Sequence, residues 1–414
     1  MPGIRIQFLR GHVWGLSKDQ IKTRIVEGVN AHTGQPMMRE MIAKLTEPLT
    51  AAERDMAEKK MDVGPATYTD TEDNLHKLFL DKRYTDFLPV VLPTEARVNE
   101  MLAQTSHAPD EILGRMNPGS VAGETWTYTV RHAAIAAVMA GAKPEYFPVI
   151  LAIGSTGATA VNISDNGFHG AVIINGKIRD EIGLNYDVGA VGPYAHANTT
   201  IGRAWSLLSI NGGNCGKVGT TYMGTVGNPS NLINIVVAEN EEGSPWEPFS
   251  VRRGFKKDEN VVTMASGWGV LSARNWAITD WSATPSYSKN IQDIYRLQNP
   301  SLFGTFAILS PPVASQVRDE GYDTMEKLVT FVTQPSPSAK QGSMGSGFEG
   351  GGAAKSKGDA VAKPKGDAAP KAGAAKPKPA ASNFNVVVTG ATNNNYWMIG
   401  GLAVGQSVSI DAWR

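Results

Sequence analysis

The chain has 414 residues, of which 42% are hydrophobic and 19% are charged, as in an ordinary globular protein of one or two domains. Lys plus Arg and Asp plus Glu both number 39, so no net charge attracts nucleic acid or an anionic membrane. The first residues do not resemble a secretory signal, and the longest apolar stretch, 133–142, is too short to span a bilayer. The single cysteine, Cys215, excludes an internal disulfide, so we expect a cytoplasmic protein.

Residues 1–65 are predicted to form a helical arm. Ser17 to Gln20 and Thr50 to Glu53 match the capping box, in which a hydroxyl and an acid or amide bond the first turn reciprocally. The Met-, Glu- and Lys-rich stretch 36–60 looks amphipathic. Such an arm packs on its own body or on a neighbouring chain, and we expect a homo-oligomer.

Residues 66–334 are predicted to form an α/β body. Acidic first turns and nearby prolines predict three short helices, which start near Asp70, at Thr94 and at Asp110. A β-branched and aromatic run predicts a strand over Thr125 to Val130, and small residues predict a helix over Ala133 to Ala140 that ends at Gly141.

The rest of the body alternates between the two element types. Helices are predicted over Thr199 to Leu208, with Thr199 or Thr200 as N-cap, and over 290–297, 312–320 and 324–332. Strands are predicted over 170–176, 232–238, 260–264 and 305–309. This order predicts an α/β fold with a mixed, layered sheet and flanking helices.

Residues 335–382 differ in kind, because Ala, Pro, Lys, Gly and Ser dominate and core-forming residues are nearly absent. We predict a flexible, disordered linker, with a docking tail for an acidic partner as the alternative. The segment 383–414 begins with a strand, Asn383 to Gly390, which is too short to be a domain. It is expected to return to the sheet of the body, and a boundary between two domains is the rival interpretation.

Common cofactor signatures are missing from the sequence. No Gly-x-Gly-x-x-Gly follows a strand and no Gly-Lys-Ser/Thr phosphate loop exists, so no nucleotide cofactor is predicted. The seven histidines form no His-x-x-x-His pair, and with one cysteine a structural zinc site is not expected.

The densest polar block, Glu239 to Glu242, directly follows the apolar run 232–237. In open α/β proteins ligands bind where strands end. Clustered carboxylates repel one another, which permits general acid–base chemistry or a divalent metal with oxygen ligands. Alternation along an extended chain places Glu239 and Glu241 on one face and Glu242 on the other. Trp246, between two prolines, is interpreted as a core residue beneath the turn, with stacking on a ligand as the alternative.

His196 and Asn198 lie at the start of the helix predicted at 199–208. Free backbone N–H groups favour anions at a helix start, and a histidine there can act as acid or base. The alternative is an Asn/Thr cap beside a solvent-exposed histidine. Cys215 is near Lys217, which favours a thiolate, but an incidental loop cysteine is the preferred interpretation.

Several segments resemble one family. They are Thr85 to Val98, Ala137 to Val149, Asn198 to Arg203, Ala238 to Pro248 and Arg252 to Phe255. Together they are similar to the poorly characterised proteins found with or fused to the UGSC-type (seleno)protein domain, which is named for its selenocysteine-Gly-Ser-Cys motif. The resemblance covers roughly residues 70–334 and 383–401.

The resemblance implies thiol- or selenol-dependent reduction, but two departures matter. The chain has no Cys-Gly-Ser-Cys motif, and Ala142 occupies the position of a family cysteine. A separate thiol- or selenol-bearing partner chain would then have to supply the redox pair.

We therefore expect an enzyme subunit that acts on a small polar or anionic molecule, by reductive cleavage of a carbon–heteroatom bond with such a partner. A redox-neutral lyase or hydrolase with a carboxylate or metal site is one alternative, and a non-catalytic scaffold is another. The candidate catalytic residues are Glu239, Glu241, Asn198 and His196. The candidate substrate-binding residues are Asn240, Arg203, Arg252 and Tyr146, and either arginine could neutralise an anion.

Overall fold

The computed structural model describes residues 17–30, 33–48, 50–51, 67–118, 125–161, 169–218, 221–222, 227–273, 286–297, 304–334, 384–392 and 396–414. The chain divides into two units, 1–68 with 337–367 and 69–336 with 368–414, and each is described by itself. The linker predicted at 335–382 lies outside the described residues, as does most of the capping box predicted at Thr50.

The first unit contains the predicted helical arm. Its elements are α1 (Lys18–Ile21), the π-helical turn η1 (Lys22–Val26) and α2 (Met37–Thr46). The predicted capping box is present, because Gln20 N donates to Ser17 Oγ (3.3 Å) and Ser17 N donates to Gln20 Oε1 (2.9 Å). On α2, the side chains of Ile42 and Leu45 are exposed at 53% and 83%.

The second unit begins with a helical layer that contains one small hairpin-like sheet. Its elements are α4 (Glu72–Asp81), α5 (Glu95–Leu102), β1 (Ile112–Met116), β2 (Trp126–Thr129), α6 (Val130–Ala140), η2 (Pro144–Tyr146), α7 (Phe147–Ser155), α8 (Ile178–Glu181) and α9 (His196–Asn211). Thr71 and Thr94 cap α4 and α5 with their side chains, close to the predicted starts. None of the described helices has the length and apolar character needed to cross a bilayer.

Two local predictions in this layer are wrong. The helix predicted at Asp110 is strand β1, which pairs antiparallel with β2, so a long-range pairing overrides the local helix signals. The N-cap predicted at Thr199 or Thr200 is also wrong, because α9 covers the predicted helix but begins at His196 with Ala195 as its N-cap.

The large sheet confirms the predicted mixed α/β fold. Its strands are β3 (His169–Asn175), β4 (Ile235–Ala238), β5 (Val261–Ala273), β6 (Thr305–Leu309), β7 (Phe384–Val388) and β8 (Tyr396–Ser409), in the order β4-β3-β5-β8-β6-β7. The connecting elements are η3 (Pro229–Asn231), α10 (Phe249–Arg252), α11 (Tyr287–Leu297), α12 (Pro311–Asp319), α13 (Met325–Val332) and η5 (Asp411–Trp413).

The two halves of this sheet have the same topology. In the first half, β3 is parallel to β4 and antiparallel to β5. In the second half, β6 is parallel to β7 and antiparallel to β8. The halves join antiparallel at the long central strands β5 and β8. The sheet is therefore an internal β-α-β-β repeat, with its two copies related by an approximate two-fold axis at its centre.

Backbone hydrogen bonds place individual residues in equivalent positions of the two copies. Glu239 N donates to Ile174 O (3.0 Å) after β4, and Thr389 N donates to Leu309 O (2.9 Å) after β7. Glu239 and Thr389 therefore occupy the same place in their respective copies.

The sheet curls so that its outermost strands meet. Asn240 N donates to Val388 O (2.7 Å), and Thr389 Oγ1 donates to Ala238 O (2.8 Å). Because β4 and β7 are the two edges, these bonds join opposite edges at their carboxyl ends. The result is a half-barrel whose edges converge at the acidic block that follows β4.

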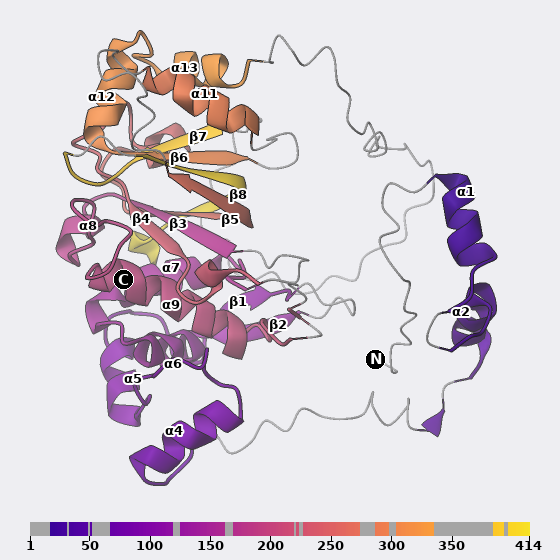
Figure 1. Cartoon of the computed structure of the whole chain (residues 1–414). Coiled ribbons are helices and arrows are strands. Elements are labelled where there is room, and N and C mark those ends of the chain that lie inside the picture. The colour runs from indigo at the N-terminus through magenta and orange to yellow at the C-terminus, as the bar shows by residue number, and fades with distance from the viewer. Residues whose placement is uncertain are drawn as a thin grey trace, which may run out of the picture. The chain divides into compact units, whose positions relative to one another are not determined.

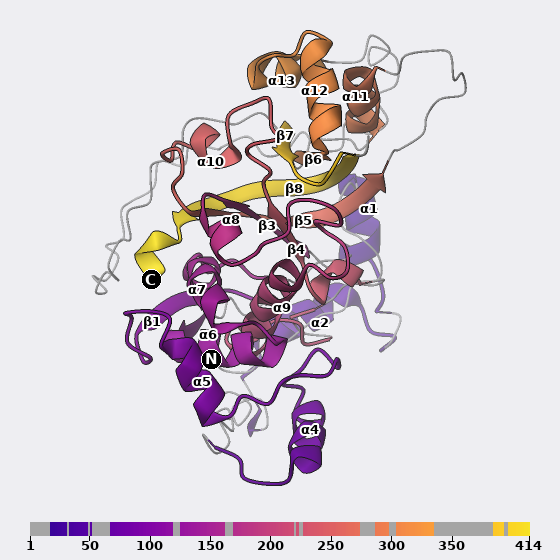
Figure 2. The same ribbon diagram turned by 90° about the vertical axis from the view of Figure 1, so that its left-hand side faces the viewer.

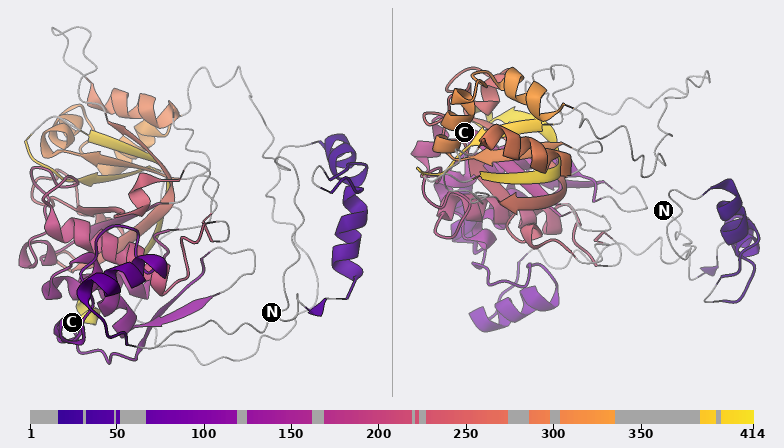
Figure 3. Two further views of the ribbon diagram at one scale, coloured as in Figure 1. Left: turned by 60° about the horizontal axis from the view of Figure 1, so that its bottom comes forward. Right: turned by 45° about the horizontal axis from the view of Figure 1, so that its top comes forward.

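Helices cover the two outer parts of the curled sheet, and a smaller core fills its inside. Val172 and Val236 face a cluster with α6, α7 and α9, whereas Leu309 and Val386 pack with α11, α12 and α13. Figures 1 and 2 show these two helical layers on opposite sides of the strands, and the views in Figure 3 agree. The inner cluster draws residues from all six strands, among them Ile173, and from α10.

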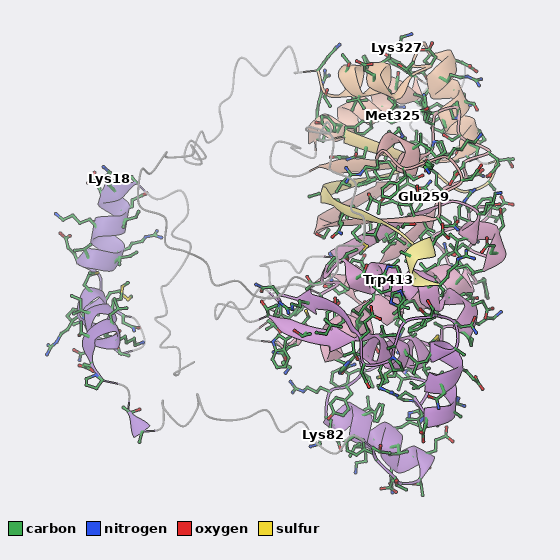
Figure 4. All side chains as sticks on the ribbon, turned by 180° about the vertical axis from the view of Figure 1, so that it is seen from behind. Lys18, Lys82, Glu259, Met325, Lys327 and Trp413 are labelled. Atoms are coloured by element: carbon green, nitrogen blue, oxygen red, sulfur yellow. The ribbon has the colours of Figure 1, made fainter. Side chains whose placement is uncertain are left out.

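The end of β8 is anchored on the first helical layer. The rings of His107 and Trp413 stack at 4.6 Å, and a ring nitrogen of His107 lies 2.9 Å from Ala412 O. Figure 4 shows Trp413 at this yellow terminal turn beside the helices. The turn η5 thus ties the second copy of the repeat to the layer that covers the first.

Candidate functional site

Glu239, the first residue after β4, is completely buried. Its Oε2 accepts hydrogen bonds from Asn175 Nδ2 and from Phe249 N, both at 2.6 Å. Its Oε1 has no donor among the described residues, since the nearest cation, Arg252 Nη2, is 3.8 Å away. Burial raises the pKa of the Glu239 carboxyl above its usual value, although Arg252 and these hydrogen bonds oppose the shift.

Glu241 and Glu242 bind one arginine from the segment that follows β3. Glu241 Oε1 accepts from Gly176 N (2.8 Å) and Asn175 Nδ2 (3.0 Å), and lies 3.5 Å from Arg179 Nε. Glu242 accepts hydrogen bonds from both terminal nitrogens of Arg179, at 3.0 and 3.2 Å. Hydrogen bonding to Arg179 holds the pKa of the Glu242 carboxyl below its ordinary value. Glu241 shares the Asn175 amide with Glu239, but β4 ends at Ala238 and Glu241 and Glu242 both reach Arg179, so the predicted separation of these acids onto two faces is wrong.

Asn240 and Trp246 hold the loop after β4 in place. Asn240 Oδ1 accepts from Gly243 N (2.8 Å), and its Nδ2 donates to Gly390 O (3.4 Å) beyond β7. Trp246 is 7% exposed, packs in the core beneath α12, and donates from Nε1 to Tyr322 O (3.0 Å). The interpretation of Trp246 as a core residue is confirmed.

Both candidate anion-binding arginines are engaged within the chain. Arg203 binds Asp86 through two nitrogens, each at 2.9 Å, and also donates to Pro89 O (2.8 Å). Arg252 donates from Nη2 to Val386 O (2.5 Å) and so bridges from α10 to β7. Each arginine is therefore held by partners within the chain, and neither is among the described residues that line the pocket discussed below.

Asn198 connects a loop to the edge of the sheet. Its Oδ1 accepts from Asn185 N (2.9 Å), and its Nδ2 donates to Asn185 O (3.1 Å) and to Val236 O (3.2 Å). Every hydrogen-bonding atom of this buried amide is occupied. Asn198 therefore fixes the segment that begins at Asn185 along the outer edge of β4, and it does not cap α9.

The structure brings two of the candidates, His196 and Tyr146, into contact with each other. His196 lies exposed on the first turn of α9, and its Nδ1 is 3.3 Å from the hydroxyl of Tyr146. The two rings are 5.9 Å apart, and Tyr146 is 3% exposed. Burial raises the pKa of Tyr146, so the phenol keeps its proton at neutral pH and can donate to Nδ1. In that arrangement the imidazole proton is on Nε2.

A pocket of about 450 Å³ lies between the start of α9, the segment 190–193 and the edge of β4. Its walls include Val191, Pro193, Thr199, Ile233 and Val236. Thr199 is three residues after His196, so the two side chains are neighbours on the same face of α9. Neither His196 nor Tyr146 is among the described residues that line the pocket, so the pair and the pocket are linked only through the first turn of α9.

The predicted site residues thus separate into three groups. Glu239, Glu241 and Arg252 belong to the buried network at the ends of β3 and β4. His196 with Tyr146, and Asn198 with the pocket wall, lie at the start of α9. Arg203 points away to its own carboxylate.

Asn175 and Arg179 complete the buried network, and sequence reasoning missed both of them. The available signal was that Asn175 ends the strand over 170–176, and parallel neighbours end at the same edge of a sheet.

Cys215 is unsuited to nucleophilic chemistry. It is fully buried, and burial raises the pKa of its thiol to about 12. Its preferred interpretation as an incidental cysteine agrees with this environment. Among the residues that the structure describes, no three His, Cys, Asp or Glu side chains come together in a group that could hold a metal ion.

Comparisons with protein-family models, with curated proteins and with solved structures found no match. The resemblance to the UGSC-associated proteins stays a prediction, and function has to be argued from the geometry.

Proposed function

We propose that the chain is an enzyme subunit that acts on a small molecule in the pocket beside α9, with His196 as its acid–base group. The observation that carries this proposal is the 3.3 Å contact between Tyr146 and the exposed His196, which lies on the same first turn of α9 as the lining residues Asn198 and Thr199. The buried hydroxyl of Tyr146 contacts Nδ1 of His196. Nε2 of the same ring is then available for proton transfer. Tyr146 is the positioning residue in this scheme.

The buried acids serve this function indirectly. Glu239 and Glu241 fix the ends of β3 and β4, and Asn198 attaches the pocket wall to the same edge strand. Arg203 and Arg252 are both paired within the chain. The reaction that is best supported is therefore one in which the substrate needs a proton donor or acceptor and no positively charged side chain. A redox-neutral lyase or hydrolase step fits this arrangement directly.

The reductive reaction implied by the resemblance needs a second chain. With Cys215 buried, the described part of the chain offers no accessible thiol of its own. A thiol- or selenol-bearing partner would approach the pocket mouth and supply the electrons, while His196 would protonate the leaving heteroatom.

The experiment is a turnover assay of His196→Asn against the matched control His76→Asn. His76 is a partly exposed histidine on α4, away from the pocket lining. With a substrate found by screening neutral small molecules, alone and with a dithiol, His196→Asn should lose about 10²–10⁴-fold in kcat, as for a lost general acid or base. Its melting temperature should equal that of the wild type. Wild-type turnover in His196→Asn would refute the proposal.

A non-catalytic scaffold is a second candidate, and it is favoured by α2. The exposure of Ile42 and Leu45 on one face of this amphipathic helix suits packing against another chain. Replacing both by glutamine should convert an oligomer to a smaller species by light scattering if the arm organises an assembly. Unchanged mass would remove this support.

A further inference from the structure

The pocket beside α9 has no charged lining. Among the residues that the structure describes, none that lines it is Asp, Glu, Lys, Arg or His. Most are apolar, including Val191 on the loop side and Ile233 and Val236 on the side of β4. Transfer of a charged group into such surroundings is costly without a partner of opposite charge.

The two amides in the lining are already satisfied. Asn198 uses its side chain to join Asn185 to Val236, as described above. Asn234 accepts from Gly170 N (2.7 Å) with Oδ1 and donates from Nδ2 to a serine hydroxyl (2.6 Å). Neither amide can reorient toward a ligand without leaving a buried group unpaired.

Two hydroxyls are left for recognition. Thr199 and Ser230 line the pocket, and among the described residues no hydrogen bond to either hydroxyl is found. A hydroxyl both donates and accepts, so these two groups suit a neutral alcohol, carbonyl or amide. Thr199 lies on the face of α9 that carries His196.

From these contacts we infer that the pocket binds an uncharged small molecule with a mainly apolar body, and that its single polar group lies at Thr199. This rests on the proposed function, in which the same pocket is the substrate site. It narrows the substrate class expected from the sequence, because the described part of the lining offers no cation to an anionic molecule. A volume of about 450 Å³ suits a ligand with one ring or a short chain.

The test uses the full-length chain and three probes that share a ring and differ in charge: benzyl alcohol, benzoate and benzylammonium. Binding is measured by calorimetry at fixed ionic strength. Benzyl alcohol should bind the wild type at least about tenfold more tightly than either charged probe. Ile233→Trp, which fills the pocket from a position already 40% exposed, should weaken benzyl alcohol by about tenfold or more.

Matched variants separate the pocket from general effects. Ile112→Trp, at an exposed position on β1 outside the lining, should bind benzyl alcohol as the wild type does. The double variant Thr199→Val with Ser230→Ala should bind toluene and benzyl alcohol equally, since it lacks the hydroxyls.

A charged probe that binds as tightly as benzyl alcohol would overturn the inference. So would wild-type affinity in Ile233→Trp, or no measurable binding of benzyl alcohol. His196→Asn should still bind benzyl alcohol normally, so the inference can fail while acid–base catalysis at His196 stands, and the reverse.

Discussion

Replacing Glu239 by alanine should destabilise the chain severely. The substitution leaves the buried Phe249 N without its acceptor, at a cost of about 1–3 kcal/mol. It also removes the carboxylate 3.8 Å from Arg252, and breaking a buried ion pair costs about 3–5 kcal/mol. Arg252 keeps its bond to Val386 O, so we expect the lower ends of both ranges, or about 4 kcal/mol in total.

Glu239→Gln separates the shape of this side chain from its charge. The glutamine oxygen can replace Oε2 as the acceptor for Phe249 N and Asn175 Nδ2. Its amide nitrogen takes the place of Oε1, which lacks a donor. Because glutamine keeps the acceptor but also removes the negative charge beside Arg252, the loss should be about 3 kcal/mol, roughly 1 kcal/mol less than for alanine. Glu242→Gln is the matched control, because Glu242 is exposed and the buried Arg179 keeps Glu241 as a partner, so its loss should cost no more than about 1 kcal/mol.

The assay is urea unfolding at neutral pH, followed by tryptophan fluorescence. Glu239→Ala should destabilise the chain most, Glu239→Gln less, and the control Glu242→Gln least. If Glu239 were a side chain lining an open site, both of its variants would unfold within about 0.5 kcal/mol of the wild type. That result would refute the account of the buried network.

Further predictions concern pH, the second arginine and the cysteine. Burial raises the folded pKa of Glu239 above its ordinary 4.5, so the stability it contributes at low pH is lost as pH rises through the folded pKa. The unfolding free energy of the wild type minus that of Glu239→Gln should therefore fall above pH 4.5, and a rise would contradict the sign. Arg203→Ala and Asp86→Ala should each cost about 3 kcal/mol, with a double variant no worse than either, whereas additive losses would show that the pair is not coupled. Cys215 should resist iodoacetamide in the folded chain and react after unfolding in urea, and rapid native labelling would contradict its burial.

The sequence predicted an element correctly where that element's structure depends mainly on residues within the same segment. The strand over Thr305 to Leu309 has the predicted bounds because five consecutive residues are buried on both faces. Thr94 caps α5 as expected, since capping uses only the first turn. The segment after Asp110 failed because its pairing with β2 is not local.

The candidate site depended on pairings that one sequence does not reveal. Arg203 meets Asp86, and Arg252 meets Val386, across more than a hundred residues each. Both arginines therefore looked available when only the sequence was considered. Asn198 was a catalytic candidate, with a helix cap as the alternative, for the same reason, because Asn185 and the edge of β4 are brought to it only by the fold.

The internal repeat left a weak trace in the sequence. The central strands carry the same Met-x-x-Gly spacing, Met264 to Gly267 in β5 and Met398 to Gly401 in β8. The two glycines approach so closely that a Cβ on Gly267 would lie 1.7 Å from Gly401 O. Small size is required where the copies cross, so these glycines mark the approximate axis.

The most direct test of the central claim is NMR of the histidine rings during ligand binding. In protein labelled with ¹³C-histidine, a substrate that is turned over should shift the ring signals of His196 and show contacts to the methyl group of Thr199. The signals of His76 should not move. Shifts confined to other histidines, with His196 unchanged at saturation, would contradict a site at the start of α9.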